Sequence, residues 1–205
     1  RMLQAESGTE LGADLVLDKR LPVASGIGGG SADAAAALRL LVRHWQIDID
    51  EATLAKLGLS LGADVPMCLS SKPLLARGIG EALEELPHFP ALPLVLVNPN
   101  IPLSTPEVFS RLERRDNPPL STLGAFTDTV SAAHWLKEAR NDLEDPACQL
   151  VPQIEDARDA LRRAGALFAR MSGSGATCFG VFSTRPEADQ AAALLEERHP
   201  DWFVL

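Results

Sequence analysis

The spacing of apolar residues predicts helices alternating with short strands along most of the chain. Apolar side chains recur at helical intervals from Ala32 to Trp45 and from Pro152 to Ala164, and the second of these segments is clearly amphipathic. Thr105 followed by Pro106 is typical of a helix start, with Thr105 as the N-cap. The other predicted elements are helices at 51–58, 131–139 and 186–198, and strands at 14–18, 73–76, 92–97, 166–171 and 177–182.

A proline-rich stretch without periodicity, residues 88–93, divides this pattern into two parts. We therefore expect one domain over residues 1–87 and a second over residues 88–205. Strands and helices are mixed in the second part, which indicates an α+β domain.

Composition limits the classes of protein that the chain fits. The net charge of −9 argues against a nucleic-acid surface, which needs clustered Lys and Arg. No run of about 18 apolar residues is present, so we expect no membrane partner and a cytoplasmic location. Three cysteines and four histidines are scattered without metal-ligand spacing, which predicts reduced thiols and no metal cluster.

Four glycines, Gly26 and Gly28 to Gly30, lie directly before Ser31 and an alanine-rich helix. Glycine backbone takes positive φ readily and can approach a bulky ligand closely. We expect Ser31 to cap a helix that begins near Ala32, with the unpaired N–H groups of the first turn directed at the ligand. A phosphate group suits this arrangement best, although a plain connecting turn is the alternative.

Residues 22–33, Pro-Val-Ala-Ser-Gly-Ile-Gly-Gly-Gly-Ser-Ala-Asp, resemble the central ATP-binding motif of the GHMP kinases. Gly62–Pro66 and Met171–Thr177 resemble two further landmarks of that family. Lys19–Pro22, Gly62–Pro66 and Asn141–Glu144 together are most similar to a member that serves isoprenoid precursor synthesis. That member phosphorylates a cytidyl-diphosphate sugar alcohol. The resemblance spans nearly the whole chain.

The resemblance implies a two-domain α+β fold. It consists of an incomplete N-terminal domain of the ribosomal protein S5 domain 2-like type and a ferredoxin-like C-terminal domain. Family members usually begin with a Pro-rich segment containing a Lys, and several strands precede the glycine loop. We therefore expect an upstream segment to carry the catalytic lysine and much of the cytidine pocket of the family.

The resemblance also implies the roles of particular residues. Asp64 matches the catalytic aspartate, which binds the substrate hydroxyl and deprotonates it. Ser31 is a candidate ligand of Mg²⁺. Further substrate contacts are implied for Thr105, Gly173, Ser174 and Gly175, within a turn that packs against the glycine loop. The implied ATP-binding residues are Pro22, Val23, Ala24, Ser25, Gly26, Ile27, Gly28, Gly29, Gly30, Ser31 and Ala32.

Each of these residues also has a purely structural interpretation. Asp64 is a candidate cap of its own turn, and Thr105 a candidate cap of its helix. The Ser172–Gly175 turn is a candidate hairpin closure. Asp33 is expected to support the helix dipole rather than to bind metal. Lys19 and Arg20 either steer the nucleotide or are simply exposed.

These observations favour an ATP-dependent small-molecule kinase that acts as a monomer or weak homodimer. The implied acceptor is the hydroxyl of a cytidyl-diphosphate sugar alcohol. A homoserine or mevalonate type of acceptor, or a nucleotide-binding module without catalysis, remains as an alternative.

Overall fold

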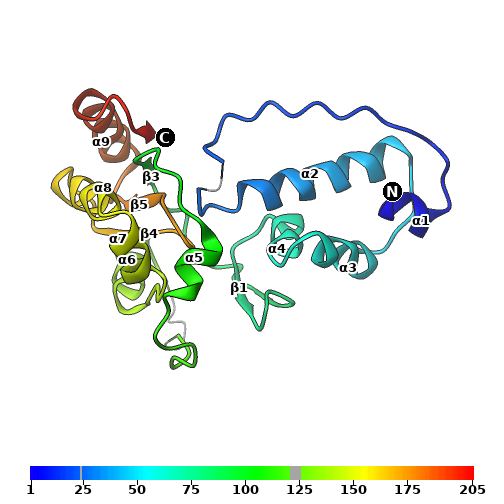
Figure 1. The fold of residues 1–205 in the computed structure, drawn as a ribbon, viewed down its shortest axis with the longest axis horizontal. Coiled ribbons are helices and arrows are strands. Elements are labelled where there is room, and N and C mark those ends of the chain that lie inside the picture. The colour runs from blue at the N-terminus through cyan, green and yellow to red at the C-terminus, as the bar shows by residue number, and fades with distance from the viewer. Residues whose placement is uncertain (24, 121–125) are drawn as a thin grey trace. The chain divides into compact units, whose positions relative to one another are not determined.

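The structure is a computed structural model that describes residues 1–23, 25–120 and 126–205 (Figure 1). Its internal contacts separate two compact units, one formed by residues 1–20 and 28–87 and the other by residues 21–27 and 88–205. The glycine-rich segment is therefore shared: residues 21–27 belong to the second unit, and Gly28 starts the continuation of the first. We still propose a domain boundary between residues 87 and 88, as the sequence predicts.

The first unit is mainly helical. Its small core includes the buried side chains of Leu3, Ala35, Leu38 and Val65. A two-stranded antiparallel hairpin follows the last helix. The elements are α1 (Met2–Ser7), α2 (Gly29–His44), α3 (Glu51–Leu61), α4 (Val65–Ser70), β1 (Leu74–Arg77) and β2 (Ala82–Glu85).

Two helix starts in this unit differ from the prediction. The N-cap of α2 is Gly28 in the left-handed conformation, at φ 68°, so the prediction that Ser31 caps the helix is wrong. Glycine tolerates this conformation, and the helix therefore begins before the serine. The second is α4, which begins at Val65 directly before Pro66 and was not among the predicted helices. Proline is accepted in a first turn, where its missing N–H costs no helical hydrogen bond.

The strand predicted at residues 14–18 is not formed. This segment is irregular, and the side chains of Leu15, Val16 and Leu17 are exposed. Alternating apolar residues form a strand only beside a partner, and among the described residues no strand pairs with this segment. The pattern alone was therefore insufficient.

The second unit contains a four-stranded antiparallel sheet in the order β4-β5-β3-β6. Its sequence of elements around the sheet is β3, α8, β4, β5, α9 and β6, which is the split βαβ arrangement of a ferredoxin-like domain. The expected fold is confirmed. The elements are β3 (Leu94–Asn98), α5 (Thr105–Ser110), α6 (Thr129–Glu138), α7 (Glu144–Leu150), α8 (Gln153–Arg163), β4 (Phe168–Met171), β5 (Cys178–Val181), α9 (Arg185–Arg198) and β6 (Phe203–Val204).

Side chains of the sheet alternate between its two faces, and residues on each face pack against helices. Cys178 in β5 packs in the larger core with residues of α8 and α9, such as Leu161 and Leu195. Val181 in the same strand belongs to a second cluster with Ala133 of α6. Helices therefore cover the sheet on both sides, and the predicted helices and strands of this unit are confirmed. Sequence patterns missed α7 and the two-residue strand β6.

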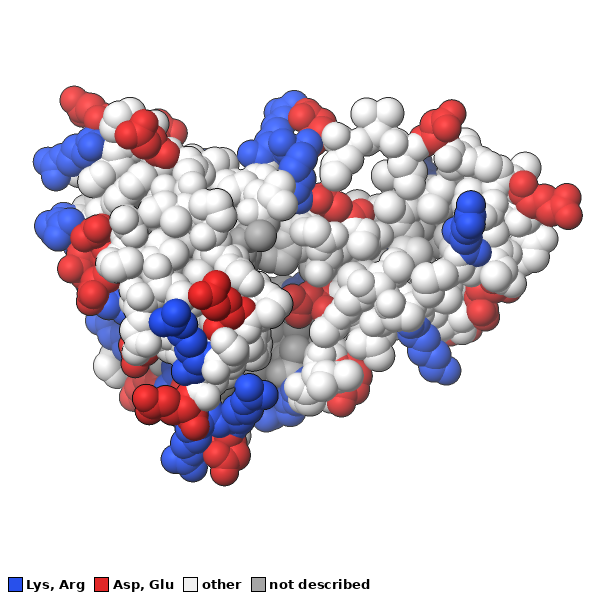
Figure 2. Space-filling view, viewed as in Figure 1, with Lys and Arg blue, Asp and Glu red and all other residues white. Residues whose placement is uncertain are grey.

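The surface carries acidic and basic side chains interspersed on the face that Figure 2 shows. Among the helices of the described residues, none combines the length and the apolar character that a bilayer crossing requires.

Leu161 offers a test of the core of the second unit. Its side chain is fully buried between α8 and the sheet, where a Cβ on Gly180 would lie 2.9 Å from it. Replacement by Ala should lower the free energy of unfolding by about 2 to 5 kcal/mol. Leu94→Ala is the matched control, because Leu94 is 43% exposed in the same sheet. Urea denaturation would contradict this packing if both variants lost the same stability.

The buried Cys178 thiol makes stability depend on alkaline pH. Burial, with a smaller contribution from Glu144, raises the pKa of the Cys178 thiol from 9.0 to about 12. The unfolded chain releases this proton from pH 9 upward and the folded chain does not, so stability is complete below pH 9 and falls as pH rises. The expected slope is on the order of 1 kcal/mol per pH unit.

Cys178→Ala removes this titration, so its free energy of unfolding should fall less than that of the parent between about pH 9 and about pH 10.5. Urea denaturation at both pH values measures the difference. Parallel declines in parent and variant would show that the folded thiol titrates normally.

Candidate active site

In the second unit, the glycine loop lies against the turn that joins β4 and β5. The Thr177 amide donates to the Ser25 carbonyl at 3.1 Å, and the Ser172 hydroxyl donates to the Gly26 carbonyl at 2.9 Å. A Cβ on Gly26 would lie 2.5 Å from the Ser172 carbonyl oxygen and 2.6 Å from that of Gly175. The loop therefore approaches the turn at a distance that only glycine permits.

The turn requires glycine on its own side as well. Gly173 has a positive φ of 53°, and a Cβ there would lie 2.8 Å from the Gly26 carbonyl oxygen. The turn does connect the antiparallel strands β4 and β5, as the hairpin interpretation expects. It also packs on the loop, as the family resemblance implies.

Buried polar groups fix the far end of this turn. The Asn98 side chain donates through Nδ2 to the Thr177 hydroxyl at 2.8 Å, and both residues are almost fully buried. The Asn98 oxygen accepts from the Asn100 amide, which satisfies the second half of the side chain. The role of Asn98 was missed in the sequence, although a polar residue ending the apolar strand β3 was the available signal.

Thr105 and Ser174 form a hydroxyl pair. Their Oγ atoms are 2.7 Å apart, and Ser174 is buried. The N-cap of α5 is Ser104, so the prediction that Thr105 caps this helix is wrong. The helix begins one residue early because Pro106 is accepted at its second position. The Thr105 hydroxyl is thereby available to the turn.

In the first unit, the start of α2 lies beside the turn that precedes α4. A Cβ on Gly62 would lie 4.0 Å from the Ser31 hydroxyl oxygen. Asp64 occupies the N-cap position of α4, yet its side chain makes no capping hydrogen bond within the described helix start, and it is exposed. The capping interpretation of Asp64 is therefore wrong.

The hairpin of the first unit supports the same turn. Gly80 has a φ of 106°, and a Cβ on it would lie 2.6 Å from the Ala63 carbonyl oxygen. The loop between β1 and β2 consequently contacts the residue directly before Asp64. This backbone contact restricts how the turn that carries the carboxylate can move.

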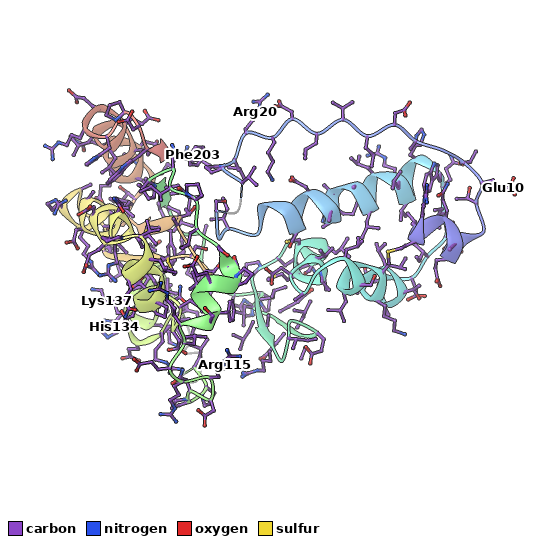
Figure 3. The ribbon with its side chains drawn as sticks, in the orientation of Figure 1. Glu10, Arg20, Arg115, His134, Lys137 and Phe203 are labelled. Atoms are coloured by element: carbon purple, nitrogen blue, oxygen red, sulfur yellow. The ribbon has the colours of Figure 1, made fainter. Side chains whose placement is uncertain are left out.

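The charged residues Lys19, Arg20 and Asp33 form ion pairs near the glycine loop. Lys19 forms an ion pair with Asp33, which is the fifth residue of α2 and lies outside its first turn. A dipole role for Asp33 is therefore wrong, because the dipole acts chiefly on the first turn. Arg20 is 85% exposed and extends into solvent, paired with Asp18 at 2.7 Å (Figure 3).

The remaining ATP-binding candidates are distributed along one continuous segment. Gly28 caps α2, and Gly29, Gly30 and Ala32 lie in its first turns. Ala24 lies outside the described residues. The others, Pro22, Val23 and Ile27, belong to the second unit together with Ser25 and Gly26.

Two family models match the chain. Residues 1–72 match the GHMP kinases N terminal domain, and residues 124–201 match the GHMP kinases C terminal domain.

Curated relatives with similar sequences carry one name. The 4-diphosphocytidyl-2-C-methyl-D-erythritol kinase of Mesorhizobium japonicum is 56% identical over 98% of this chain and 68% of its own length. The enzyme of the same name from Chelativorans sp. is 53% identical, with 93% of this chain and 65% of its own length covered. The Rhizobium etli protein is 56% identical, over 92% of this chain and 63% of the relative. The chain thus spans about two thirds of these relatives.

A solved structure agrees with the sequence comparison. The crystal structure of a 4-(cytidine 5'-diphospho)-2C-methyl-D-erythritol kinase has a TM-score of 0.80 and 30% identity, covering 99% of this chain and 74% of the other. A homoserine kinase from Cytophaga hutchinsonii has a TM-score of 0.71 at 18% identity, covers 91% of this chain and 67% of the other, and shows the shared fold alone. The chain therefore belongs to the GHMP kinases, in the family of the 4-diphosphocytidyl-2-C-methyl-D-erythritol kinases.

Proposed function

We propose that this protein is an ATP-dependent kinase that phosphorylates a hydroxyl of 4-diphosphocytidyl-2-C-methyl-D-erythritol. The proposal rests on the relatives of that name, which are 52–56% identical to the chain. This reaction belongs to the methylerythritol phosphate route to isoprenoid precursors. The match to the homoserine kinase, at 18% identity, concerns the fold and does not favour that acceptor.

The observation that carries the chemical part is the backbone approach of Gly26 to the Ser172–Gly175 turn. A plain connecting loop does not require contacts so close that a Cβ on Gly26 or Gly173 would clash. A loop that presents its N–H groups to phosphates does, because its backbone must be held open and in one conformation. We assign the ATP phosphates to the segment from Pro22 to Ala32, which leads into the positive end of the α2 dipole.

The residues present also fit a magnesium ion carried mainly by the nucleotide. Among the described residues no group of three or more His, Cys, Asp and Glu is arranged to hold a metal. Mg²⁺ keeps several waters and binds through nucleotide phosphates with few protein ligands, so the Ser31 hydroxyl is a sufficient protein contribution. When bound, the ion neutralises charge on the phosphates during transfer.

We assign the acceptor hydroxyl to Asp64. Its carboxylate is exposed and is not engaged in capping α4, which leaves its oxygens available to orient the alcohol and take its proton. The proximity of Gly62 to the Ser31 hydroxyl supports a role for this turn near the start of α2. Further substrate contacts are proposed for Thr105, Gly173, Ser174 and Gly175, and Lys19 is proposed to influence nucleotide binding through its pair with Asp33.

We further propose a small-molecule substrate as the partner, a cytoplasmic location, and a monomer or weak homodimer. The test of the activity is ADP release by the full-length protein with Mg-ATP and the cytidyl alcohol, with homoserine and mevalonate as parallel acceptors. Turnover confined to the cytidyl alcohol is the expected result. Turnover on another acceptor, or none, would contradict the proposed substrate.

Asp64→Asn should lower kcat by a factor on the order of 100 or more, because the amide cannot accept the proton of the alcohol. The KM for ATP should change little. Asp48→Asn removes an exposed carboxylate from the loop between α2 and α3 of the same unit and should leave kcat unchanged. A loss of less than about tenfold in Asp64→Asn would remove Asp64 from the role of base.

Gly26→Ala should reduce kcat/KM for ATP strongly, because the added Cβ forces the loop and the turn apart. A misplacement of about 1 Å near reacting groups can cost on the order of 100-fold in rate. Gly165→Ala is the matched control: Gly165 has a φ of 99°, but its Cβ would meet open space. It should lose about 1 to 3 kcal/mol of stability because of its backbone conformation, and no activity. Equal activities of the two variants would refute the importance of the close approach.

A further inference from the structure

We propose that Asn141 and Glu144 are positioning residues that hold the Ser172–Gly175 turn in place and, through this turn, the loop residues Ser25 and Gly26. The inference rests on the proposed function, because the loop is assigned there to the ATP phosphates. The sequence analysis used the Asn141–Glu144 segment only as part of the family resemblance, and the inference assigns a structural role to two of its residues.

Asn141 binds the turn through both protons of its amide. Nδ2 donates to the Met171 carbonyl at 3.0 Å and to the Gly173 carbonyl at 2.8 Å. The amide oxygen accepts from the Leu143 backbone N–H at 3.1 Å, which fixes the orientation of the side chain. A group that offers two donors and one acceptor is needed here, and an aspartate of the same size offers no donor when ionised.

Glu144 binds the backbone N–H of Met171, whose carbonyl accepts from Asn141. Its Oε2 accepts from the Met171 backbone N–H at 2.8 Å, and its Oε1 pairs with Arg158 of α8. The side chains of Glu144 and Arg158 are each only 15% exposed. A carboxylate at such a site is held by both partners, because removing either one leaves the other poorly solvated.

Together the two side chains hold Met171 at its N–H and at its carbonyl, directly before the turn. Gly173, one residue after Ser172, is held at its carbonyl in a conformation with positive φ. Asn141 and Glu144 both bind backbone groups, so they fix the backbone conformation of the turn independently of its side chains.

Two hydrogen bonds join the turn and the residue directly before β5 to the glycine loop, so the position of the turn determines the position of the loop. The Ser172 hydroxyl donates to the Gly26 carbonyl, and the Thr177 amide donates to the Ser25 carbonyl. Because Gly26 and the turn meet without side chains between them, a displaced turn displaces the loop. Asn141 and Glu144 should therefore influence the binding of phosphates through backbone contacts alone.

The decisive variants are Asn141→Asp and Glu144→Gln, made in the full-length protein. Asn141→Asp directs carboxylate oxygens at two carbonyls, whereas Glu144→Gln keeps an acceptor oxygen and removes the charge. Asp142→Asn is the control for the first variant, since Asp142 interacts with Arg140 and Asn117 instead of the turn. Glu155→Gln is the control for the second, because Glu155 is the more exposed partner of Arg158.

Two readouts separate positioning from a loss of general stability. Affinities for ATP and for adenosine are measured well below the melting temperature of each variant. Asn141→Asp should weaken ATP binding by roughly tenfold or more, since two hydrogen bonds are replaced by repulsion, and should leave adenosine binding unchanged. Glu144→Gln should act in the same direction with a smaller effect. Both controls should behave as the parent.

Native-state hydrogen exchange of the Thr177 amide is the second readout and does not depend on activity. This amide touches neither Asn141 nor Glu144 but binds Ser25, so faster exchange in the variants is expected if the clamp reaches the loop. Unchanged ATP affinity, an equal loss for adenosine, or unchanged Thr177 exchange would each overturn the inference. Absence of turnover in the parent would instead overturn the proposed function and leave the exchange result standing.

Discussion

The contact between two stretches of bare backbone is the constraint on which the second unit depends. Gly26 and the Ser172–Gly175 turn meet at distances that leave no room for a Cβ on Gly26 or Gly173. Such a contact gains little from apolar burial, since it contains almost no side chain. It must be stabilised by hydrogen bonds to the peptide groups themselves, and the surrounding polar residues supply these bonds.

This requirement explains why polar side chains are buried, and one ion pair is largely shielded from solvent, in an otherwise apolar domain. Asn98 and Thr177 bind each other beneath the sheet end, and the Glu144–Arg158 pair lies between α7 and α8. Apolar residues of similar volume would often stabilise a fold as well as a buried ion pair does. They could not bind the Met171 N–H, however, so the polar choice has a geometric reason.

The elements that follow local rules could be predicted from the sequence. The amphipathic pattern of residues 152–164 indicated a helix, and the structure has α8 there. The glycine-rich segment before Ala32 indicated the start of another helix, and α2 begins within that segment. Prediction failed where a second segment decides the outcome. Residues 14–18 alternate as a strand does but have no partner strand among the described residues. The cap of α2 was mispredicted for a local reason instead: Gly28 adopts the left-handed conformation, and the helix begins before Ser31.

Some residues of the candidate site could not be assigned a role from the sequence because their partners are backbone groups. A motif indicates Asp64 and Ser31 by residue type, since the chemistry proposed for them belongs to the side chain. Asn141 acts on peptide groups thirty and thirty-two positions further along the chain, and neither hydrogen bond leaves a local pattern. Side chains that hold backbone therefore need the tertiary structure to be recognised. Groups that perform chemistry can be found earlier, while the groups that keep their loops in place become visible only through the contacts they make.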